Sequence, residues 1–253
     1  MARLLGSLPK GLDLVVVDSG STDQTVAIAK SFGARVYDRD FTDFADQKNF
    51  AIEKCKRSWV LALDADEVVS PDMRSYFEQS FAVEIEPLEN VCFRLTRYLI
   101  FDHKKMRFGK TKDAPIRLFP SNMRYEGIVH EVIRTETAQI KKLHQGYLEH
   151  HSYKNHADYF SRFNRYTTEI AKKHYQAGKS FRPGITHWLR PFIEFISRYV
   201  IRGGFLDGRR GYTYALYSSL YAYVKYEKLL ELESSGISES SVEQRRAGQT
   251  SRS

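Results

Sequence analysis

The chain has 253 residues, of which 42% are hydrophobic and 28% are charged, and its formal net charge at pH 7 is +8. This length and composition are ordinary for a soluble globular protein with one large domain, or with a core domain and an appendage. No signal peptide and no run of eighteen apolar residues occurs, which argues against secretion and against membrane spanning. The positive charge favours an anionic partner: nucleic acid, anionic lipid or a phosphorylated substrate.

The amino-terminal part of the chain alternates apolar strands with helices. We expect strand, helix, strand, helix and strand over residues 14–17, 25–32, 34–37, 47–56 and 59–63. Uniformly apolar strands between helices predict an α/β fold, Rossmann-like, with a mostly parallel sheet and helices on both faces.

Two acidic turns follow the first and last of these strands. The first runs from Asp18 to Asp23 and the second from Asp64 to Glu67. Because ligands of parallel sheets bind at the carboxyl ends of the strands, we expect both turns on one rim. Several carboxylates on one rim suit a hard divalent cation that shares its other positions with phosphate oxygens. Alone, the triplet Asp64-Ala65-Asp66 could be a solvated loop. The position of the triplet after an apolar strand favours a role in binding a metal and a nucleotide.

Two glycine-containing segments resemble phosphate loops but lack the required spacing. Gly109-Lys110-Thr111 and Gly178-Lys179-Ser180 end like such loops, yet the glycine needed five residues earlier is Lys104 in one and Lys173 in the other. No GxGxxG motif follows the first strand either. The sequence therefore argues against P-loop and dinucleotide sites.

The motifs, taken in order, resemble the family 2 glycosyltransferases of GT-A fold, in particular the lipopolysaccharide-core β-glucosyltransferases. The resemblance extends from about Leu12 to Leu232. The segments that resemble the family are Val16–Asp23, Gln47–Ala51, Leu63–Glu67, Arg117–Phe119, Val129–Glu131 and Gly204–Gly208.

The resemblance implies a UDP-sugar donor and Mg²⁺ or Mn²⁺ as cofactor. It places Asp18 at the uridine and Asp66 as the direct metal ligand, with Asp64 at the ribose or reaching the metal through water. His150 is a candidate third metal ligand, and a structural or surface histidine is the alternative. The other residues that we expect to bind the nucleotide sugar are Ser19, Gly20, Asp23, Lys48 and Arg117.

Direct displacement at a sugar carbon needs one base to deprotonate the acceptor hydroxyl. We expect Glu131 in that role with His130 beside it, because both follow an apolar strand. In the alternative interpretation Glu131 caps a loop and His130 packs, and Asp113 is a weaker rival for the base.

The carboxy-terminal part is helical and rich in aromatic and basic residues. We expect a core of residues 1–153, a helical acceptor or membrane-proximal region of residues 154–232 and a disordered tail of residues 233–253. An aromatic stripe is typical of core packing. Basic residues beside it also suit a surface on anionic lipid: Arg190, Arg198, Arg202, Arg209, Arg210, Lys225 and Lys228.

The start of the chain departs from the family pattern. Met1 falls within what would be the first helix of the fold, so we expect the first strand of the family to be missing. The function that the resemblance implies is an inverting hexosyltransferase acting on a glycolipid or glycan of the cell envelope, in the cytoplasm at the inner membrane face. A polyprenyl-phosphate acceptor is one alternative. A non-catalytic basic protein that binds lipid or nucleic acid is another, although two acidic turns would repel phosphate without a cation. We therefore expect no nucleic-acid partner.

Overall fold

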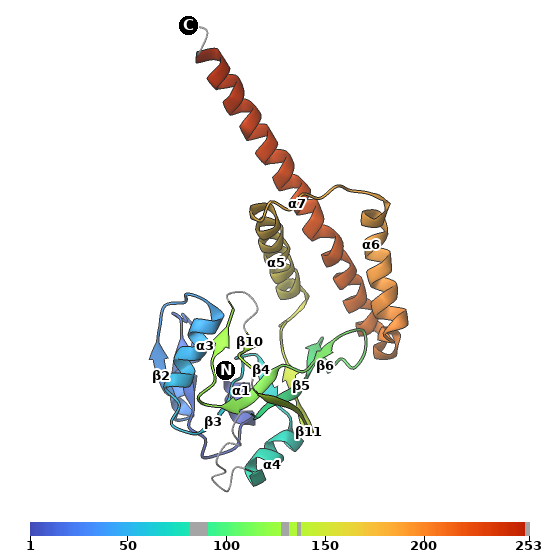
Figure 1. Ribbon diagram of the computed structural model, residues 1–253. Helices are drawn as coiled ribbons and strands as arrows, with labels where there is room; N and C mark the ends of the chain where they lie inside the picture. Colours follow the sequence, from blue (N-terminus) through green and yellow to red (C-terminus); the bar gives the residue numbers. More distant parts are fainter. Residues whose placement is uncertain (81–90, 128–131, 136–137, 251–253) are drawn as a thin grey trace. The chain divides into compact units, whose positions relative to one another are not determined.

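The structure is a computed structural model that describes residues 1–80, 91–127, 132–135 and 138–250, with the backbone alone for residues 236–250. The chain divides into two compact units (Figure 1). The first contains residues 1–100 and 112–152, and the second contains residues 101–111 and 153–253. The sequence did not indicate that residues 101–111 belong with the helices.

The amino-terminal half of the first unit has the expected alternation of strands and helices. Its elements are α1 (Ala2–Ser7), β1 (Val15–Asp18), α2 (Thr25–Ser31), β2 (Arg35–Asp38), α3 (Phe44–Glu53) and β3 (Trp59–Leu61). β1 and β2 pair in parallel, as a connection through a helix requires. Leu5, Ala29 and Ala34 form a small core beneath this pair. The predicted α/β class is confirmed.

A larger sheet completes the first unit, with strands in the order β3-β8-β5-β11-β4. The remaining elements of the unit are β4 (Glu67–Val69), α4 (Pro71–Ser80), β5 (Val91–Phe101), β7 (Lys112–Asp113), β8 (Ile116–Pro120), β9 (Tyr125–Glu126), β10 (Val132–Ile133) and β11 (Gln139–His150). β5 and β11 pair in parallel, whereas β3–β8, β8–β5 and β11–β4 are antiparallel. The larger sheet is thus not mostly parallel, contrary to the prediction. A uniformly apolar sequence indicates that a strand is buried, but it does not indicate whether its neighbours run parallel or antiparallel to it.

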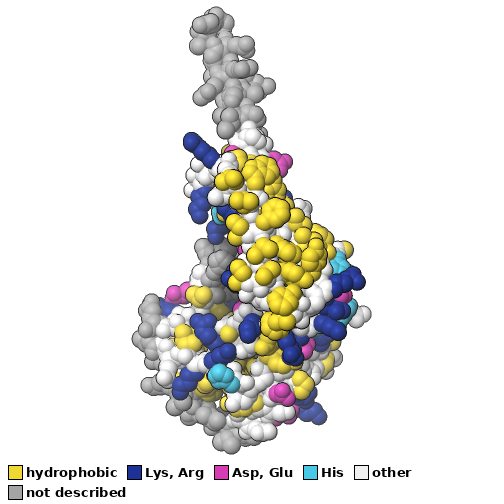
Figure 2. Space-filling model, turned by 90° about the vertical axis from the view of Figure 1, so that its right-hand side faces the viewer, with side chains coloured by type: hydrophobic (Ala, Val, Ile, Leu, Met, Phe, Trp, Pro, Cys, Tyr) yellow, Lys and Arg dark blue, Asp and Glu magenta, His cyan; other side chains and the backbone are white. Residues whose placement is uncertain are grey.

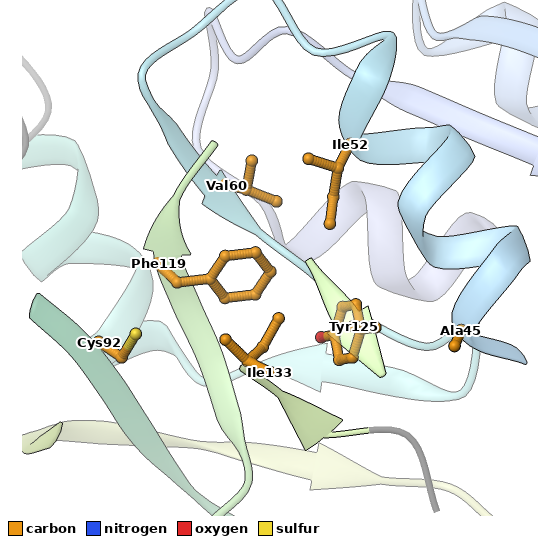
Figure 3. Close-up of a cluster of buried hydrophobic side chains, with 7 residues drawn as sticks. All are labelled: Ala45, Ile52, Val60, Cys92, Phe119, Tyr125 and Ile133. Carbon is orange, nitrogen blue, oxygen red and sulfur yellow. The ribbon is translucent and has the colours of Figure 1, made fainter. Parts of the chain in front are cut away.

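A buried cluster joins α3 to these strands (Figure 3). Its members are Ala45, Ile52, Val60, Cys92, Phe119, Tyr125 and Ile133. Ile52 and Ala45 lie on the side of α3 that faces the Phe119 and Tyr125 rings. The two ring centroids are 5.7 Å apart in an edge-to-face arrangement. This packing fixes α3 relative to the strands, and with it the polar side chains that α3 presents outside the cluster.

The second unit is built on a long helix. Its elements are β6 (Lys104–Lys105), α5 (His156–Gln176), α6 (Ile185–Ile196), a π-helical turn η1 (Ser197–Ile201), a 3-10 turn η2 (Gly204–Asp207) and α7 (Gly208–Thr250). α5 and α6 both pack on α7. The helical backbone of α7 continues beyond Leu232, through residues that we expected to be a disordered tail. Among the described residues, no helix has both the length and the apolar run that crossing a bilayer requires.

One carboxylate holds residues 101–111 against these helices. The Asp207 side chain accepts the backbone N–H groups of Arg107 and Phe108, at 3.0 and 2.9 Å from Oδ2. Gly109 donates its N–H to the carbonyl oxygen of Arg202. The Gly204–Gly208 motif therefore has a structural role in the second unit.

Candidate active site

Adjacent side chains of α3 contact both acidic turns. Gln47 Nε2 donates to Ser19 Oγ at 2.6 Å, in the turn after β1. Lys48 Nζ lies 3.2 Å from Asp64 Oδ1, in the turn after β3. α3 therefore links the two turns, although β1 and β3 belong to different sheets, so the prediction of one rim of a single parallel sheet is not met.

The first turn is organised by its own carboxylate. Asp18 is buried at the end of β1, and its Oδ2 accepts the backbone N–H groups of Gly20 at 3.1 Å and Ser21 at 2.8 Å. The hydrogen bonds from Ser21 hold the pKa of Asp18 below its usual range, against the opposing effect of burial. Asp23 Oδ1 accepts the N–H of Thr25, the first residue of α2, so this side chain stabilises the helix start.

The second turn is a network of charges. Arg117 Nη2 donates to Asp64 Oδ2 and to Glu67 Oε1, at 2.5 and 2.6 Å. Burial opposes the ionised form of Asp64, but Arg117 and Lys48 together hold its pKa below the usual value. Burial likewise opposes the charge of Arg117, and Glu67 and Asp64 raise its pKa above the usual value. Asp64 is therefore a carboxylate between two cations.

Sequence reasoning missed the residue at the centre of this network. Glu67 has no exposed surface, and its Oε1 also accepts a hydrogen bond from Arg97 Nη1 at 2.6 Å. Its Oε2 accepts the backbone N–H of Asp64 at 3.0 Å. Arg97 in turn binds both carboxylate oxygens of Asp113. The carboxylate of Asp113 is thus already engaged, which counts against Asp113 as the catalytic base.

A further missed contact joins α3 to β9. Asn49 Nδ2 donates to the Tyr125 carbonyl oxygen at 2.9 Å, and Asn49 Oδ1 accepts the Tyr125 N–H at 2.8 Å. The Lys48 ammonium lies 5.2 Å from the centre of the Tyr125 ring. Asn49 therefore fixes the backbone of a residue whose ring borders both the core and the charge network.

Asp66 and His150 meet at the other end of the second turn. Asp66 Oδ2 is 3.4 Å from His150 Nε2, and the Asp66 carbonyl oxygen accepts the N–H of His151 at 2.8 Å. Burial opposes ionisation of Asp66, but the hydrogen bond from His150 and its charge hold the pKa of Asp66 below the usual value. Within the described ranges, no group of three His, Cys, Asp or Glu side chains has metal-binding geometry. Asp66 and His150 offer one carboxylate and one imidazole, a donor set that suits a cation completing its coordination with phosphate and water.

One buried polar atom of this region stands out. In the part of the chain that the structure describes, Gln47 Oε1 has no hydrogen-bond partner, whereas the Tyr125 hydroxyl lies against the Arg117 guanidinium. A buried polar atom without a partner is costly, so Gln47 is a side chain of this region with an unmet hydrogen bond.

The expected base lies outside the described residues. Glu131 and His130 immediately precede β10, and the structure gives no position for either side chain. Their assignment stays a prediction from the sequence.

Comparisons with known proteins show which proteins the chain resembles. Residues 2–103 match the family described as Glycosyl transferase family 2. The chain is 28% identical to an uncharacterized glycosyltransferase of Rickettsia typhi, over 92% of this chain and 82% of that protein. It is 33% identical to an uncharacterized glycosyltransferase of Rickettsia felis, over 48% of this chain and 40% of that protein. It is 26% identical to the lipopolysaccharide core biosynthesis glycosyltransferase LpsC of Rhizobium meliloti, over 91% of this chain and 87% of that protein. Residues 2–103 thus match the family 2 glycosyltransferases on an α/β architecture, and most of the chain is similar to proteins named glycosyltransferases.

Proposed function

We propose that the chain is an inverting, metal-dependent transferase that moves a hexose from a UDP-sugar to a lipopolysaccharide-core or related cell-envelope glycan. The observation that supports it best is the attachment of both acidic turns to adjacent residues of α3. A nucleotide has a polar base and ribose at one end and a diphosphate at the other, so a matching site needs two such turns side by side. The similarity to LpsC favours the acceptor class.

The nucleotide would contact residues of both turns. We assign Asp18, Ser19 and Gly20 to the uridine side, with Asp23 supporting the turn from the start of α2. Lys48 and Arg117 supply positive charge beside Asp64, where a diphosphate would otherwise be repelled. A polar group of the donor would supply the missing hydrogen-bond partner of Gln47.

Asp66 would hold Mg²⁺ or Mn²⁺ directly, with His150 as a further ligand and Asp64 reaching it through water. When bound, the cation would stabilise the negative charge that develops on the departing diphosphate. His150 lies within reach of Asp66, in keeping with this assignment. Glu131 would accept the proton of the acceptor hydroxyl, with His130 beside it.

The acceptor would be a glycolipid or glycan at the cytoplasmic face of the inner membrane, and the protein would touch that membrane peripherally. We expect no nucleic-acid partner. A basic binding protein would bind UDP without a metal, whereas the proposed transferase requires one.

Calorimetric titration of UDP with and without Mn²⁺ tests this function. We expect UDP to bind only with the metal, and Asp66→Asn to weaken binding at least about tenfold by removing a ligand charge. Asp40→Asn removes an exposed aspartate from the same unit and should leave the affinity unchanged. Metal-independent binding of UDP, or full affinity in Asp66→Asn, would overturn the metal assignment. A screen of UDP-hexoses and UDP-N-acetylhexosamines then identifies the sugar.

A further inference from the structure

Large apolar side chains remain exposed on one face of the second unit, as the continuous yellow area over the helices in Figure 2 shows. We call this the α6 face. It contains Ile185, Trp188, Leu189, Phe192, Ile193, Ile196, Val200, Ile201, Phe205, Leu206, Tyr212, Leu216 and Leu220. Phe192 is 70% exposed, and Ile185 and Ile201 are each 76% exposed. Soluble monomers rarely expose so many large apolar side chains together, and such patches mark interaction surfaces.

The α6 face is not the side by which α6 packs on its neighbour. That packing uses His187, which is fully buried, donates from Nε2 to Glu227 Oε1 at 2.7 Å and stacks on the Tyr223 ring at 4.7 Å. Trp188, Phe192 and the other exposed residues of α6 recur every three or four positions and so form a second stripe. The helix is therefore apolar beyond what its contact with α7 requires.

The charges around the α6 face are mostly positive. Residues 185–220 contain five arginines, one glutamate and one aspartate. The glutamate, Glu194, is paired with Arg198 at 2.6 Å, and the aspartate, Asp207, accepts backbone N–H groups. Arg202 and Arg209 are exposed. Two copies of such a surface would repel each other, whereas anionic lipid headgroups complement it.

We propose that the α6 face is a membrane-docking surface that lies in the headgroup region of an anionic lipid layer. Its apolar side chains would enter the boundary of the acyl chains, and Arg202 and Arg209 would contact lipid phosphates. Trp188 and Tyr212 suit this boundary because their rings are apolar at one end and polar at the other. This surface would make the peripheral membrane contact proposed above. Only the presence of a glycolipid acceptor in that membrane rests on the proposed function.

Vesicle co-sedimentation of the full-length chain tests the proposal. We expect binding to vesicles of phosphatidylcholine with phosphatidylglycerol, and much weaker binding to phosphatidylcholine alone. Phe192→Glu combined with Ile193→Glu should weaken binding at least about tenfold, since two exposed apolar side chains no longer enter the lipid. Arg202→Gln and Arg209→Gln should each weaken it about fivefold. Phe41→Glu, at a site 52% exposed in the first unit, is the matched control and should bind as the unchanged protein does.

Two further measurements separate this proposal from its competitors. Docking is overturned if the unchanged chain ignores the anionic vesicles, or if Phe192→Glu with Ile193→Glu binds them equally well. It is also overturned if ultracentrifugation shows a dimer that this double variant dissociates without any lipid binding, because the face would then contact a second copy. Mn²⁺-dependent UDP affinity should be the same in the double variant and the unchanged chain. If the unchanged chain does not bind UDP, the proposed function is refuted. If it binds UDP but not the vesicles, only the docking is refuted.

Discussion

Replacing Glu67 by glutamine tests the charge network behind the second acidic turn. The change keeps the shape of a fully buried side chain and removes its charge. Oε1 accepts hydrogen bonds from Arg97 and Arg117, and Oε2 accepts the N–H of Asp64. A glutamine must place its NH₂ group against one of these donors, so at least one hydrogen bond is lost.

Removing one partner of a buried ion pair costs about 3–5 kcal/mol. Because Arg97 and Arg117 keep Asp113 and Asp64 as partners, we expect a loss at the low end, about 3 kcal/mol in the free energy of unfolding. For a unit of this size, that corresponds to a fall in the unfolding temperature of roughly 6–12 °C. The affinity for UDP should also fall, since Arg117 and the Asp64 backbone lose a common partner.

The two tryptophans allow this unit to be followed alone. Trp59 lies in β3, 5.9 Å from the Phe93 ring between centroids, whereas Trp188 lies in α6. In a Trp188→Phe background, the fluorescence of Trp59 reports unfolding of the first unit. Glu78→Gln is the matched control, because it breaks an exposed pair with Arg74 and should cost less than about 0.5 kcal/mol. A loss below about 1 kcal/mol in Glu67→Gln would refute the reasoning.

Three other predictions concern stability. Burial alone would raise the pKa of Asp13, but Arg35 outweighs this effect, and the pKa lies below its ordinary value of 3.8. The stabilisation from this pair is therefore present above pH 3.8 and is lost as the pH falls through the lowered pKa. Arg35→Met should destabilise the protein to urea at pH 7, and the difference in stability between this variant and the unchanged chain should vanish in acid. Gly146→Ala should lower the free energy of unfolding by about 2–4 kcal/mol, because φ is +72° and a Cβ would collide with α4. Gly33→Ala is the control, since φ is +78° but the space around it is open, and it should cost about 1 kcal/mol. Equal losses of stability in thermal unfolding would contradict this. Asp207→Asn should speed tryptic cleavage within residues 101–111, because the carboxylate that accepts two backbone N–H groups is weakened, and unchanged cleavage would count against its role.

The local elements of the fold were predictable, and the strand directions were not. The alternation from β1 to β3 was evident because each strand is a short apolar run and each helix has a periodic apolar face. The antiparallel pairing of β3 with β8 joins residues about sixty positions apart, and no local pattern reports such a partner. The same holds for residues 101–111, whose place in the helical unit depends on Asp207.

The site shows a similar division. The places of Asp18 and Asp64 in turns after apolar strands were predictable from the sequence, whereas the roles of these two residues and of Lys48 stay predictions. Glu67 was expected only as a member of the second acidic turn, with no role of its own. The alternation of side chains along a strand could have indicated its burial, because residues two apart lie on the same face and Glu67 shares its face of β4 with the buried Val69. Its arginine partners come from β5 and β8, and only the folded chain brings them together.

The contacts of α3 constrain how the length of this helix can vary in evolution. Successive positions on a helix are separated by about 100°, so Gln47, Lys48 and Asn49 point in three directions and each reaches a different part of the first unit. Inserting or deleting one residue upstream in α3 would turn all three away from their targets at once. Variation among related enzymes should therefore preserve the length of this helix even where its outer surface diverges. Differences in donor preference should arise instead in the turns that it contacts.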